Sequence, residues 1–295
     1  MPSLAAPDLN DPATCGEDLA FNLANVSALA ERHCRGCGDY HVVFAARRLT
    51  GSAESVEIDR AEMARLIASV IEDRLALSPS ASVLIAGAAD TGILATAAHA
   101  VAGLGTEALY RTSFLVLDRC PTPLRLCAAY AERNRLRVAT EAVDLSVDET
   151  PRAVDIVVVH SLFRHMPLAT HVETLHRFAS WLRPGGQIVF SHRIVGEDAA
   201  TVTSGAEREE TAIRIRRRVE SGELVIGEPL AAFEARIARR RLATVHTSSY
   251  ASVDSLMGLF AAAGLKAVSV HKLHRAASAP GAHERTRLIA MLTKP

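Results

Sequence analysis

The chain has 295 residues, of which 49% are hydrophobic and 22% charged, which is the composition of a folded globular protein. Lys plus Arg and Asp plus Glu both total 33, so the formal net charge is zero, and a nucleic-acid binder with a broad basic surface is disfavoured. Aromatic residues make up only 4%, which leaves few side chains to stack on bases.

The opening segment, MPSLAAPDLNDP, has no basic stretch followed by an apolar core, so a secretory signal is not expected. No run approaches about 18 uncharged apolar residues, so no membrane partner is expected either. The five cysteines are therefore expected to be reduced thiols of a cytoplasmic protein. Whether the protein forms a homodimer is left open.

Residues 1–78 are predicted to form an N-terminal helical cap. Apolar residues recur at helical spacing from Asp18 to about His33, which predicts the first helix. Two glycines end that pattern, and Asp39 is placed to cap a second helix that runs toward Leu49.

A third helix is predicted from a start signal and an apolar stripe. Asp59 and Glu62 have the spacing of a capping box, in which a side chain at the helix start and one three residues later satisfy free backbone N–H groups. The stripe that follows has the spacing of a buried helix face and consists of Met63, Leu66, Ile67, Val70 and Ile71.

Residues 79–295 change to apolar runs that alternate with helical segments. The predicted strands are SVLIAG (82–87), SFLVLD (113–118), LRVATEAVDL (136–145), AVDIVVVH (153–160) and GQIVFSH (186–192). Continuous apolar strands separated by helices predict an α/β fold in which a parallel sheet is covered on both faces.

The last part of the chain is predicted to contain an insertion and a terminal strand pair. A helical insertion rich in Arg and Glu is expected at about 197–246. A helix at 253–263 and strands near 266–272 and at 285–292 follow, the two strands as an antiparallel pair. The arginines of the insertion are interpreted as solvated faces of lid helices, with a grip on an acidic acceptor as the alternative; they are Arg214, Arg216–Arg218 and Arg239–Arg241.

The stretch VLIAGAADTG (83–92) predicts a strand, a turn of small residues and the start of a helix. Small residues in the turn let a ligand approach the backbone closely, and the helix start offers free N–H groups to an anion. Asp118 ends the next strand, where an acid can accept hydrogen bonds from both hydroxyls of a ribose. The pattern Gly87-x-Ala89-x-x-Gly92 is a degraded dinucleotide fingerprint, with a plain tight turn as the alternative.

Residues 80–295 resemble the class I S-adenosylmethionine-dependent methyltransferases. The most specific match is FASWLRPGGQIVF (178–190), and VLDRCPTP, EAVDLS and DIVVVHSLFRHMP match the segments after strands 2, 3 and 4. The resemblance implies a doubly wound Rossmann-like sheet, mostly parallel with a reversed last strand, to which the cap and an insertion after strand 5 are added. It also implies S-adenosyl-L-methionine as cofactor and a small-molecule methyl acceptor.

The resemblance assigns a set of residues to the cofactor. Those beside its methionine part would be Gly87, Ala88, Ala89 and Gly92; Asp118 would hold the ribose, Arg119, Asp144 and Leu145 would lie by the adenine, and His160 and Ser161 by the sulfonium. The chain departs from the family at Ile85, where an acidic residue is usual, and at Ala89, which replaces the second glycine. Asp90 is the residue that could compensate for the missing acid.

A hydroxyl, phenol or ammonium acceptor must lose a proton during methyl transfer, and histidine has the suitable unperturbed pKa. The candidate bases are His160 and His165 after strand 4, His192 after strand 5, and His41 in the cap. The family's usual acceptor position favours, as catalytic residues, His160, His192, Tyr40 and His41. For each histidine the alternative is a hydrogen bond to backbone or solvent.

Three other functions are weighed against methyl transfer. A nicotinamide-dependent dehydrogenase would also use Asp118 and the glycine turn, but no substrate domain is evident after the sheet. A protein that binds S-adenosylmethionine without methylating anything stays open because of Ile85. A base methylase is disfavoured because the segment after strand 4 lacks an Asn/Asp-Pro-Pro-aromatic motif.

Cys34 and Cys37 have C-x-x-C spacing, and Cys15 and His41 could complete a zinc-binding set. The preferred interpretation is that these are ordinary reduced thiols at a turn between helices, with no metal. A structural metal, and then a redox or metalloid role, are the alternatives. Cys127 is expected to pack in the core.

Overall fold

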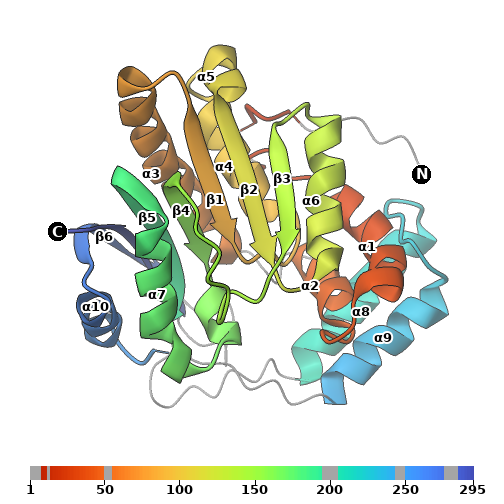
Figure 1. The fold of residues 1–295 in the computed structure, drawn as a ribbon. Helices are drawn as coiled ribbons and strands as arrows, with labels where there is room; N and C mark the ends of the chain where they lie inside the picture. The colour runs from red at the N-terminus through yellow and green to blue at the C-terminus, as the bar shows by residue number, and fades with distance from the viewer. Residues whose placement is uncertain (1–7, 12–13, 50–54, 195–204, 243–249, 276–284) are drawn as a thin grey trace.

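The computed structural model describes residues 8–11, 14–49, 55–194, 205–242, 250–275 and 285–295. Its centre is one seven-stranded sheet in the order β3-β2-β1-β4-β5-β7-β6 (Figure 1). The strands are β1 Ala81–Ala86, β2 Thr112–Asp118, β3 Val138–Ala142, β4 Val154–His160, β5 Leu182–Ile194, β6 Lys266–Arg275 and β7 Arg285–Thr293. All pairs from β3 to β5 are parallel, and β7 runs antiparallel to both of its neighbours. The expected fold class, a doubly wound sheet with a reversed last strand, is confirmed.

The helices surround this sheet and lie close to where the sequence predicts them. They are α1 Leu19–His33, α2 Tyr40–Leu49, α3 Ser55–Leu77, α4 Gly92–Ala102, α5 Thr106–Arg111, α6 Pro121–Arg133, α7 His171–Ser180, α8 Gly205–Glu220, α9 Leu230–Leu242 and α10 Val253–Ala262, with two 3-10 turns, η1 Leu162–His165 and η2 Leu168–Thr170. The helix α5 was not predicted, because it buries no residue and so carries no apolar stripe. None of the described helices is long and apolar enough to cross a bilayer.

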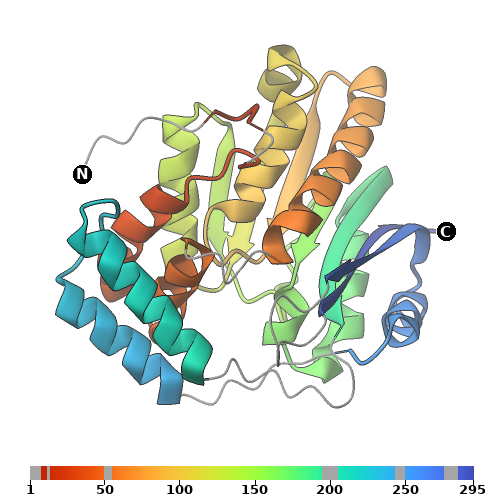
Figure 2. The ribbon, with the colours of Figure 1, turned by 180° about the vertical axis from the view of Figure 1, so that it is seen from behind.

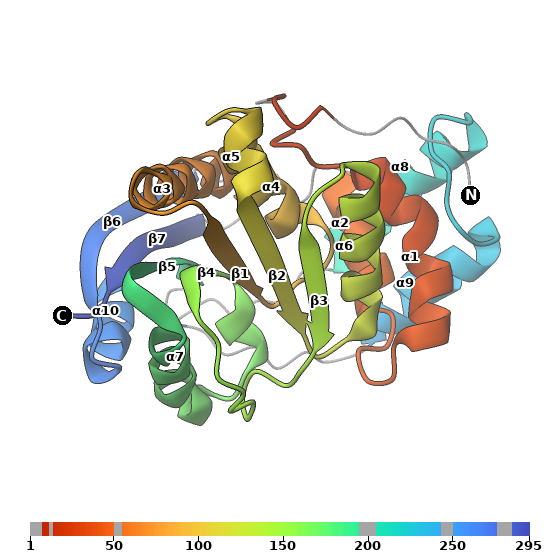
Figure 3. The same cartoon turned by 45° about the horizontal axis from the view of Figure 1, so that its top comes forward.

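The central strands bury both of their faces. In β1, Val83 and Ile85 pack in the core beneath α3, α4 and α6, whereas Leu84 and Ala86 pack in the core beneath α7 and α10. Figure 2 shows α3 and α4 in front of the sheet, and Figure 3 shows α7 and α10 on its other side. Ile85 is fully buried in the first core, where an apolar side chain is favoured and an unpaired carboxylate would be costly.

The helices α1, α2, α8 and α9 form a separate layer beside the sheet, here called the four-helix layer (Figures 1 and 2). Its buried residues form one cluster, which also includes Leu126 of α6: Phe21, Leu23, Val26, Ala30, Val42, Ala45, Ala46, Ile215, Leu224, Phe233 and Ile237. Asp18 caps α1 by accepting a hydrogen bond from the Phe21 N–H (2.9 Å). The predicted insertion therefore packs on the first two helices of the chain.

The prediction that Asp59 and Glu62 cap the third helix is wrong. The helix α3 begins at Ser55, so both residues lie inside it. Asp59 is fully buried, whereas Glu62 pairs with Arg65 and His271 at the surface. An acid followed three residues later by Glu is compatible with a cap and with an inward-facing carboxylate, so the local pattern could not decide between them.

The apolar stripe of α3 is buried as predicted, but it packs with the sheet. Met63, Ile67 and Ile71 belong to the same core as the central strands and α4. On packing grounds α3 thus lies with the sheet, while α1 and α2 lie with the insertion. A division of the chain at residue 78 stays a proposal.

Candidate functional site

The carboxyl ends of the central strands form the expected ligand-binding edge of the sheet. The neighbours of β1 are β2, which follows it directly in the chain, and β4. The order of the sheet therefore reverses between β1 and β4, which is the switch point where ligands bind in doubly wound folds. The strand arrowheads of β1, β2 and β3 point toward this edge, and α2 lies next to it (Figure 1).

Gly87 makes the turn at the end of β1. Its φ is +80°, a conformation that L side chains rarely adopt, and its N–H donates to the Leu117 carbonyl at 2.8 Å. A Cβ here would lie 2.8 Å from Leu162 Cδ1, because η1 packs directly on the turn. The glycine is thus required by the fold whether or not a ligand is bound.

Asp118 lies against the same turn, as the sequence predicts. Its Oδ2 accepts from the Ala88 N–H (2.8 Å) and its Oδ1 accepts from the Cys120 N–H (2.7 Å). Burial raises the pKa of this carboxyl above its ordinary value, although both hydrogen bonds oppose that shift. A carboxylate offers about four acceptor positions, so two remain for ribose hydroxyls.

The segment after β3 reaches the same edge. The Val143 N–H donates to the Asp118 carbonyl (3.0 Å), which brings Asp144 and Leu145 to the neighbourhood of β2. Asp144 accepts from the hydroxyl (2.6 Å) and the N–H (3.0 Å) of Ser146, and these bonds lower its pKa. The exposed Arg119 lies near enough to lower it further.

Asp90 and Gly92 face a buried cluster of ions, which differs from the expectation that they line the cofactor. Asp90 pairs with Arg48 (2.9 Å) and accepts from the Gly92 N–H (2.8 Å). Arg48 also pairs with Glu17, and Glu17 lies 3.2 Å from Arg60. We call Glu17, Arg48, Arg60 and Asp90 the buried ion cluster.

The cluster occupies the space beside the first residue of α4. A Cβ at Gly92 would lie 2.3 Å from Arg48 Nη1 and 2.7 Å from Arg60 Nη2. The side chains of all four members are less than 9% exposed, so this part of the turn is filled by the protein itself. The absence of a side chain at position 92 is therefore explained by the close approach of two arginines.

His160 is held by Asp59 and is a poor candidate for a catalytic base. Its Nε2 lies 2.9 Å from Asp59 Oδ2, which also pairs with Arg287 (3.0 Å) and accepts from the Ser191 hydroxyl (2.9 Å). Burial lowers the pKa of His160 to about 4, so the ring is neutral at pH 7. Ser161, whose φ is +54°, accepts from Arg287 (3.0 Å).

His192 lies in the core among other rings. It is 1% exposed, and its ring centroid lies 6.0 Å from that of Phe190 and 5.5 Å from that of Tyr250. Burial lowers the pKa of His192 to about 3, and its Nδ1 has no hydrogen-bond partner among the residues that the structure describes. A base so weak and so enclosed is a poor candidate for meeting an acceptor.

The rings of Tyr40 and His41 at the start of α2 meet edge to face, with 5.1 Å between their centroids, but their other partners differ. His41 is buried, and its Nδ1 lies 3.0 Å from the Ala89 carbonyl oxygen. The Tyr40 ring stacks on Phe44 (5.7 Å between centroids) and meets the edge of the His165 ring (5.5 Å). The Tyr40–His165 contact therefore joins the four-helix layer to the segment after β4, and His165 is the exposed histidine of this group.

The arginines of the insertion make contacts at the surface of the four-helix layer. Arg216 pairs with Glu234 (2.5 Å) and Arg218 with Glu223 (2.7 Å). The side chains of Arg239–Arg241 lie outside the described residues. The described pairs agree with the interpretation of these arginines as solvated helix faces.

Four residues that shape this edge were not predicted: Glu17, Arg48, Arg60 and Cys120. The signal for Arg60 was a charge placed just before the apolar stripe of α3. Cys120 carried no signal, since it lies 83 positions beyond Cys37 and its neighbourhood depends on how α2 packs near β2.

No protein-family model matches the chain, and no curated protein sequence matches it. Aligned solved structures include the apo S-adenosylmethionine-dependent methyltransferase SibL, at 18% identity over 73% of this chain and 51% of that chain, with a TM-score of 0.44. Another is an O-methyltransferase family 2 protein from Planctomyces limnophilus in complex with apigenin, at 18% identity over 91% and 66% of the two chains, with a TM-score of 0.47. The cyclase SpnF aligns at 13% identity over 78% and 80%, with a TM-score of 0.48.

The chain thus spans about half of the first of these proteins and 66% of the second. Identities this low do not transfer a substrate or an activity. The fold itself follows from the sheet: strand order β3-β2-β1-β4-β5-β7-β6, a single reversed strand at β7, and a glycine turn after β1 beside an acid that ends β2. The chain therefore has the Rossmann-like fold of the class I S-adenosylmethionine-dependent methyltransferases.

Proposed function

We propose that the chain binds S-adenosyl-L-methionine at the carboxyl ends of β1 and β2 and transfers its methyl group to a small-molecule acceptor. The observation that carries this proposal is the position of Asp118, which lies against the glycine turn at 2.8 Å from the Ala88 N–H and keeps acceptor positions free. Asp144 and Arg119 at the adjoining strand ends support a neighbouring adenine site.

The acceptor would lie between α2 and η1. Tyr40 and His165 contact each other there, one from the four-helix layer and one from the segment after β4. Aromatic rings supply flat apolar surface that can orient a small organic acceptor. His165 is exposed, so of the histidines named above it is the one best placed to take a proton from an incoming acceptor.

The cofactor, when bound, supplies an electrophilic methyl group on a sulfonium. The chain's own contribution is to hold the acceptor atom behind that carbon and to keep water away from it. His165 would accept the proton of a hydroxyl, phenol or ammonium acceptor, and Tyr40 would orient the acceptor against the ring of His165. His160 and His192 would keep the edge of the sheet rigid, since both are buried and neutral at pH 7.

A second function, binding of S-adenosylmethionine without methyl transfer, is favoured by two observations. The buried ion cluster fills the space beside Gly92, and Asp59 holds the histidine expected next to the sulfonium. Cofactor affinity and methyl transfer are therefore tested separately.

Binding is tested by calorimetry with S-adenosylmethionine, S-adenosylhomocysteine and NADH. We expect both S-adenosyl compounds to bind and NADH not to bind. Asp118→Asn should weaken S-adenosyl binding at least about tenfold, or about 1.4 kcal/mol, because a carboxylate that accepts two ribose hydroxyls is replaced by an amide. The control is Asp254→Asn on the exposed face of α10. Binding of NADH alone would overturn the proposal.

Methyl transfer is tested with radiolabelled S-adenosylmethionine and a panel of phenols, thiols and amines. For any phenol or amine that is methylated, His165→Gln should lower kcat about 100-fold and leave the Kd for S-adenosylhomocysteine unchanged. Tight cofactor binding without a labelled product from the panel or from a metabolite extract would favour the second function.

A further inference from the structure

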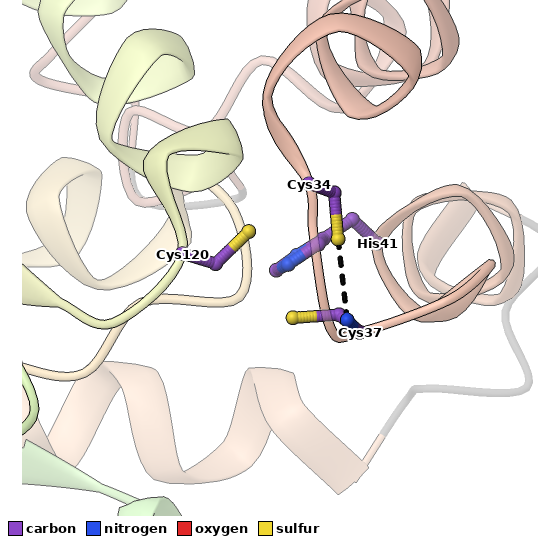
Figure 4. A group of neighbouring side chains, drawn as sticks. All are labelled: Cys34, Cys37, His41 and Cys120. Carbon is purple, nitrogen blue, oxygen red and sulfur yellow. Dashed lines mark hydrogen bonds between the residues drawn. The ribbon is translucent and has the colours of Figure 1, made fainter.

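Three cysteines and one histidine from distant parts of the chain meet beside the glycine turn. The ligand atoms of Cys34, Cys37, His41 and Cys120 all lie within 4.8 Å of one another (Figure 4). Cys34 ends α1, Cys37 lies in the turn before α2, His41 lies in the first turn of α2, and Cys120 precedes α6. We call these four residues the Cys3His cluster.

The turn between α1 and α2 is shaped to bring its two thiols together. The Cys37 N–H donates to Cys34 Sγ at 3.3 Å, and the Tyr40 N–H donates to the Cys37 carbonyl at 3.2 Å. Gly38, with a φ of +56°, allows the chain to reverse at this point. This turn therefore brings Cys34 Sγ and Cys37 Sγ within 4.8 Å of each other.

His41 is oriented to offer a lone pair to the cluster. Its Nδ1 lies 3.0 Å from the Ala89 carbonyl, and a carbonyl oxygen can only accept, so Nδ1 carries the hydrogen. The other ring nitrogen, Nε2, is buried and has no hydrogen-bond partner of good geometry in the described part of the chain, where the Cys120 thiol is its neighbour; His41 is 3% exposed. A histidine whose second nitrogen donates to a backbone carbonyl is the usual arrangement of a metal ligand.

We propose that Cys34, Cys37, His41 and Cys120 bind one zinc ion in tetrahedral geometry. In a tetrahedral site, zinc–sulfur bonds of about 2.3 Å and zinc–nitrogen bonds of about 2.0 Å place the ligand atoms about 3.5–3.8 Å apart, and the observed separations of up to 4.8 Å are close to that range. Thiolate and imidazole ligands exclude Mg²⁺ and Ca²⁺, which take oxygen. Thiols that bind release their protons to solvent, and no electron is transferred.

Four protein ligands leave no coordination position for a substrate, so the ion has a structural role. It joins the α1–α2 turn to the loop between β2 and α6. In that loop the Cys120 N–H donates to Asp118 Oδ1 at 2.7 Å, which positions the carboxylate at the end of β2. His41 in turn forms a hydrogen bond to the Ala89 carbonyl of the glycine turn. Zinc would therefore connect the four-helix layer to the edge where the cofactor is proposed to bind.

The zinc set considered from the sequence contained Cys15 in place of Cys120. Cys15 is buried but is not a member of the Cys3His cluster. This difference provides a matched control, because Cys15→Ser removes a buried thiol of the same chain without removing a ligand.

The first experiment measures metal content by mass spectrometry on untagged protein purified without added metal. We expect about one zinc per chain in the native protein and in Cys15→Ser. Cys34→Ser, Cys37→Ser and Cys120→Ser should each lose most of the zinc. Less than about a tenth of a zinc per chain in the native protein, another metal in its place, or equal zinc loss in Cys15→Ser would overturn the proposal.

A second experiment does not depend on whether the variants fold. Native protein is treated with a chelator and then titrated with Co²⁺. One equivalent should produce the intense visible bands of tetrahedral, thiolate-bound cobalt, and Zn²⁺ should displace it and raise Tm. Weak bands of octahedral cobalt, or no uptake, would overturn the proposal. Neither measurement requires the cofactor, so the zinc site and the proposed function can fail independently.

Discussion

Nε2 of His160 lies 2.9 Å from Oδ2 of Asp59, and the same carboxylate oxygen lies 3.0 Å from Nε of Arg287. The three residues come from β4, α3 and β7, and the Asp59 side chain is fully buried. Despite burial, which opposes ionisation, the charge of Arg287 and the hydrogen bond from His160 hold the pKa of Asp59 well below its ordinary range. Through these two interactions Asp59 connects α3 to β4 and β7.

Asp59→Asn should lower the free energy of unfolding by about 3–5 kcal/mol. The amide keeps the shape of the side chain but leaves Arg287 as a buried charge without a counter-ion, and breaking a buried pair in this way costs that much. The measurement is urea unfolding at pH 7, followed by circular dichroism.

The control for Asp59 is Glu62→Gln, one turn further along α3. Glu62 pairs with Arg65, whose side chain is 57% exposed, so solvent screens the interaction. Its loss should cost less than about 1 kcal/mol. Equal losses in the two variants would contradict the special role of Asp59.

His192 should make the protein less stable as the pH falls from about 6.5 toward 3. Burial lowers the folded-state pKa of His192 to about 3 from an ordinary value of 6.5. Below pH 6.5 the unfolded chain takes up a proton that the folded chain does not, so the free energy of unfolding falls by a few kcal/mol, on the order of 1.4 per pH unit.

His192→Phe should flatten the pH dependence of stability between pH 6.5 and 4, measured by urea unfolding. The charged and titratable groups that face His192 stay in place and act in both proteins: Arg287 from β7, Arg164 from η1, His171 from α7, His160 from β4 and Tyr250. His176→Gln, at an exposed site on α7, should leave the wild-type dependence unchanged. An unchanged profile for His192→Phe would show that burial does not suppress protonation of this ring.

Gly92→Ala should destabilise the protein by about 1–3 kcal/mol. The added Cβ would lie 2.3 Å from Arg48 and 2.7 Å from Arg60, so it would displace the arginines of the buried ion cluster. Gly258→Ala in α10 is the control, since nothing lies within 4 Å of its added Cβ. Alanine there should raise stability by about 0.5–1 kcal/mol, because glycine is a weak helix former.

Gly227→Ala should separate the insertion from α1. The added Cβ would lie 2.4 Å from the Ala24 carbonyl oxygen, and this clash cannot be relieved by a side-chain rotation because the oxygen belongs to the backbone of α1. The bond from the Ser27 hydroxyl to Glu228 (2.7 Å) would be lost with it. Hydrogen exchange should show faster opening of α8 and α9 while the central strands stay protected. Unchanged exchange in α8 and α9 would mean that the insertion packs in some other way.

The strands and their faces could be predicted because the information is local. The run from Val154 to Val159 is apolar at almost every position and rich in β-branched residues, which is typical of a strand covered on both sides. The apolar stripe of α3 could be predicted for the same reason, because its helical spacing is visible in neighbouring residues. The capping prediction at Asp59 failed because a local pattern does not reveal whether a carboxylate faces solvent or an arginine 228 positions away.

Local patterns were enough to predict the sheet, the glycine turn and the acid at the end of β2, since period, turn chemistry and strand ends are properties of neighbouring residues. The roles of the reactive side chains, in contrast, depend on the packing of elements that are distant in the sequence. In the folded chain His160 and His192 are enclosed, and Asp90 forms an ion pair with Arg48. Cys120 lies beside Cys34, Cys37 and His41. Burial and the choice of partner depend on how distant elements pack, and side-chain chemistry follows from both.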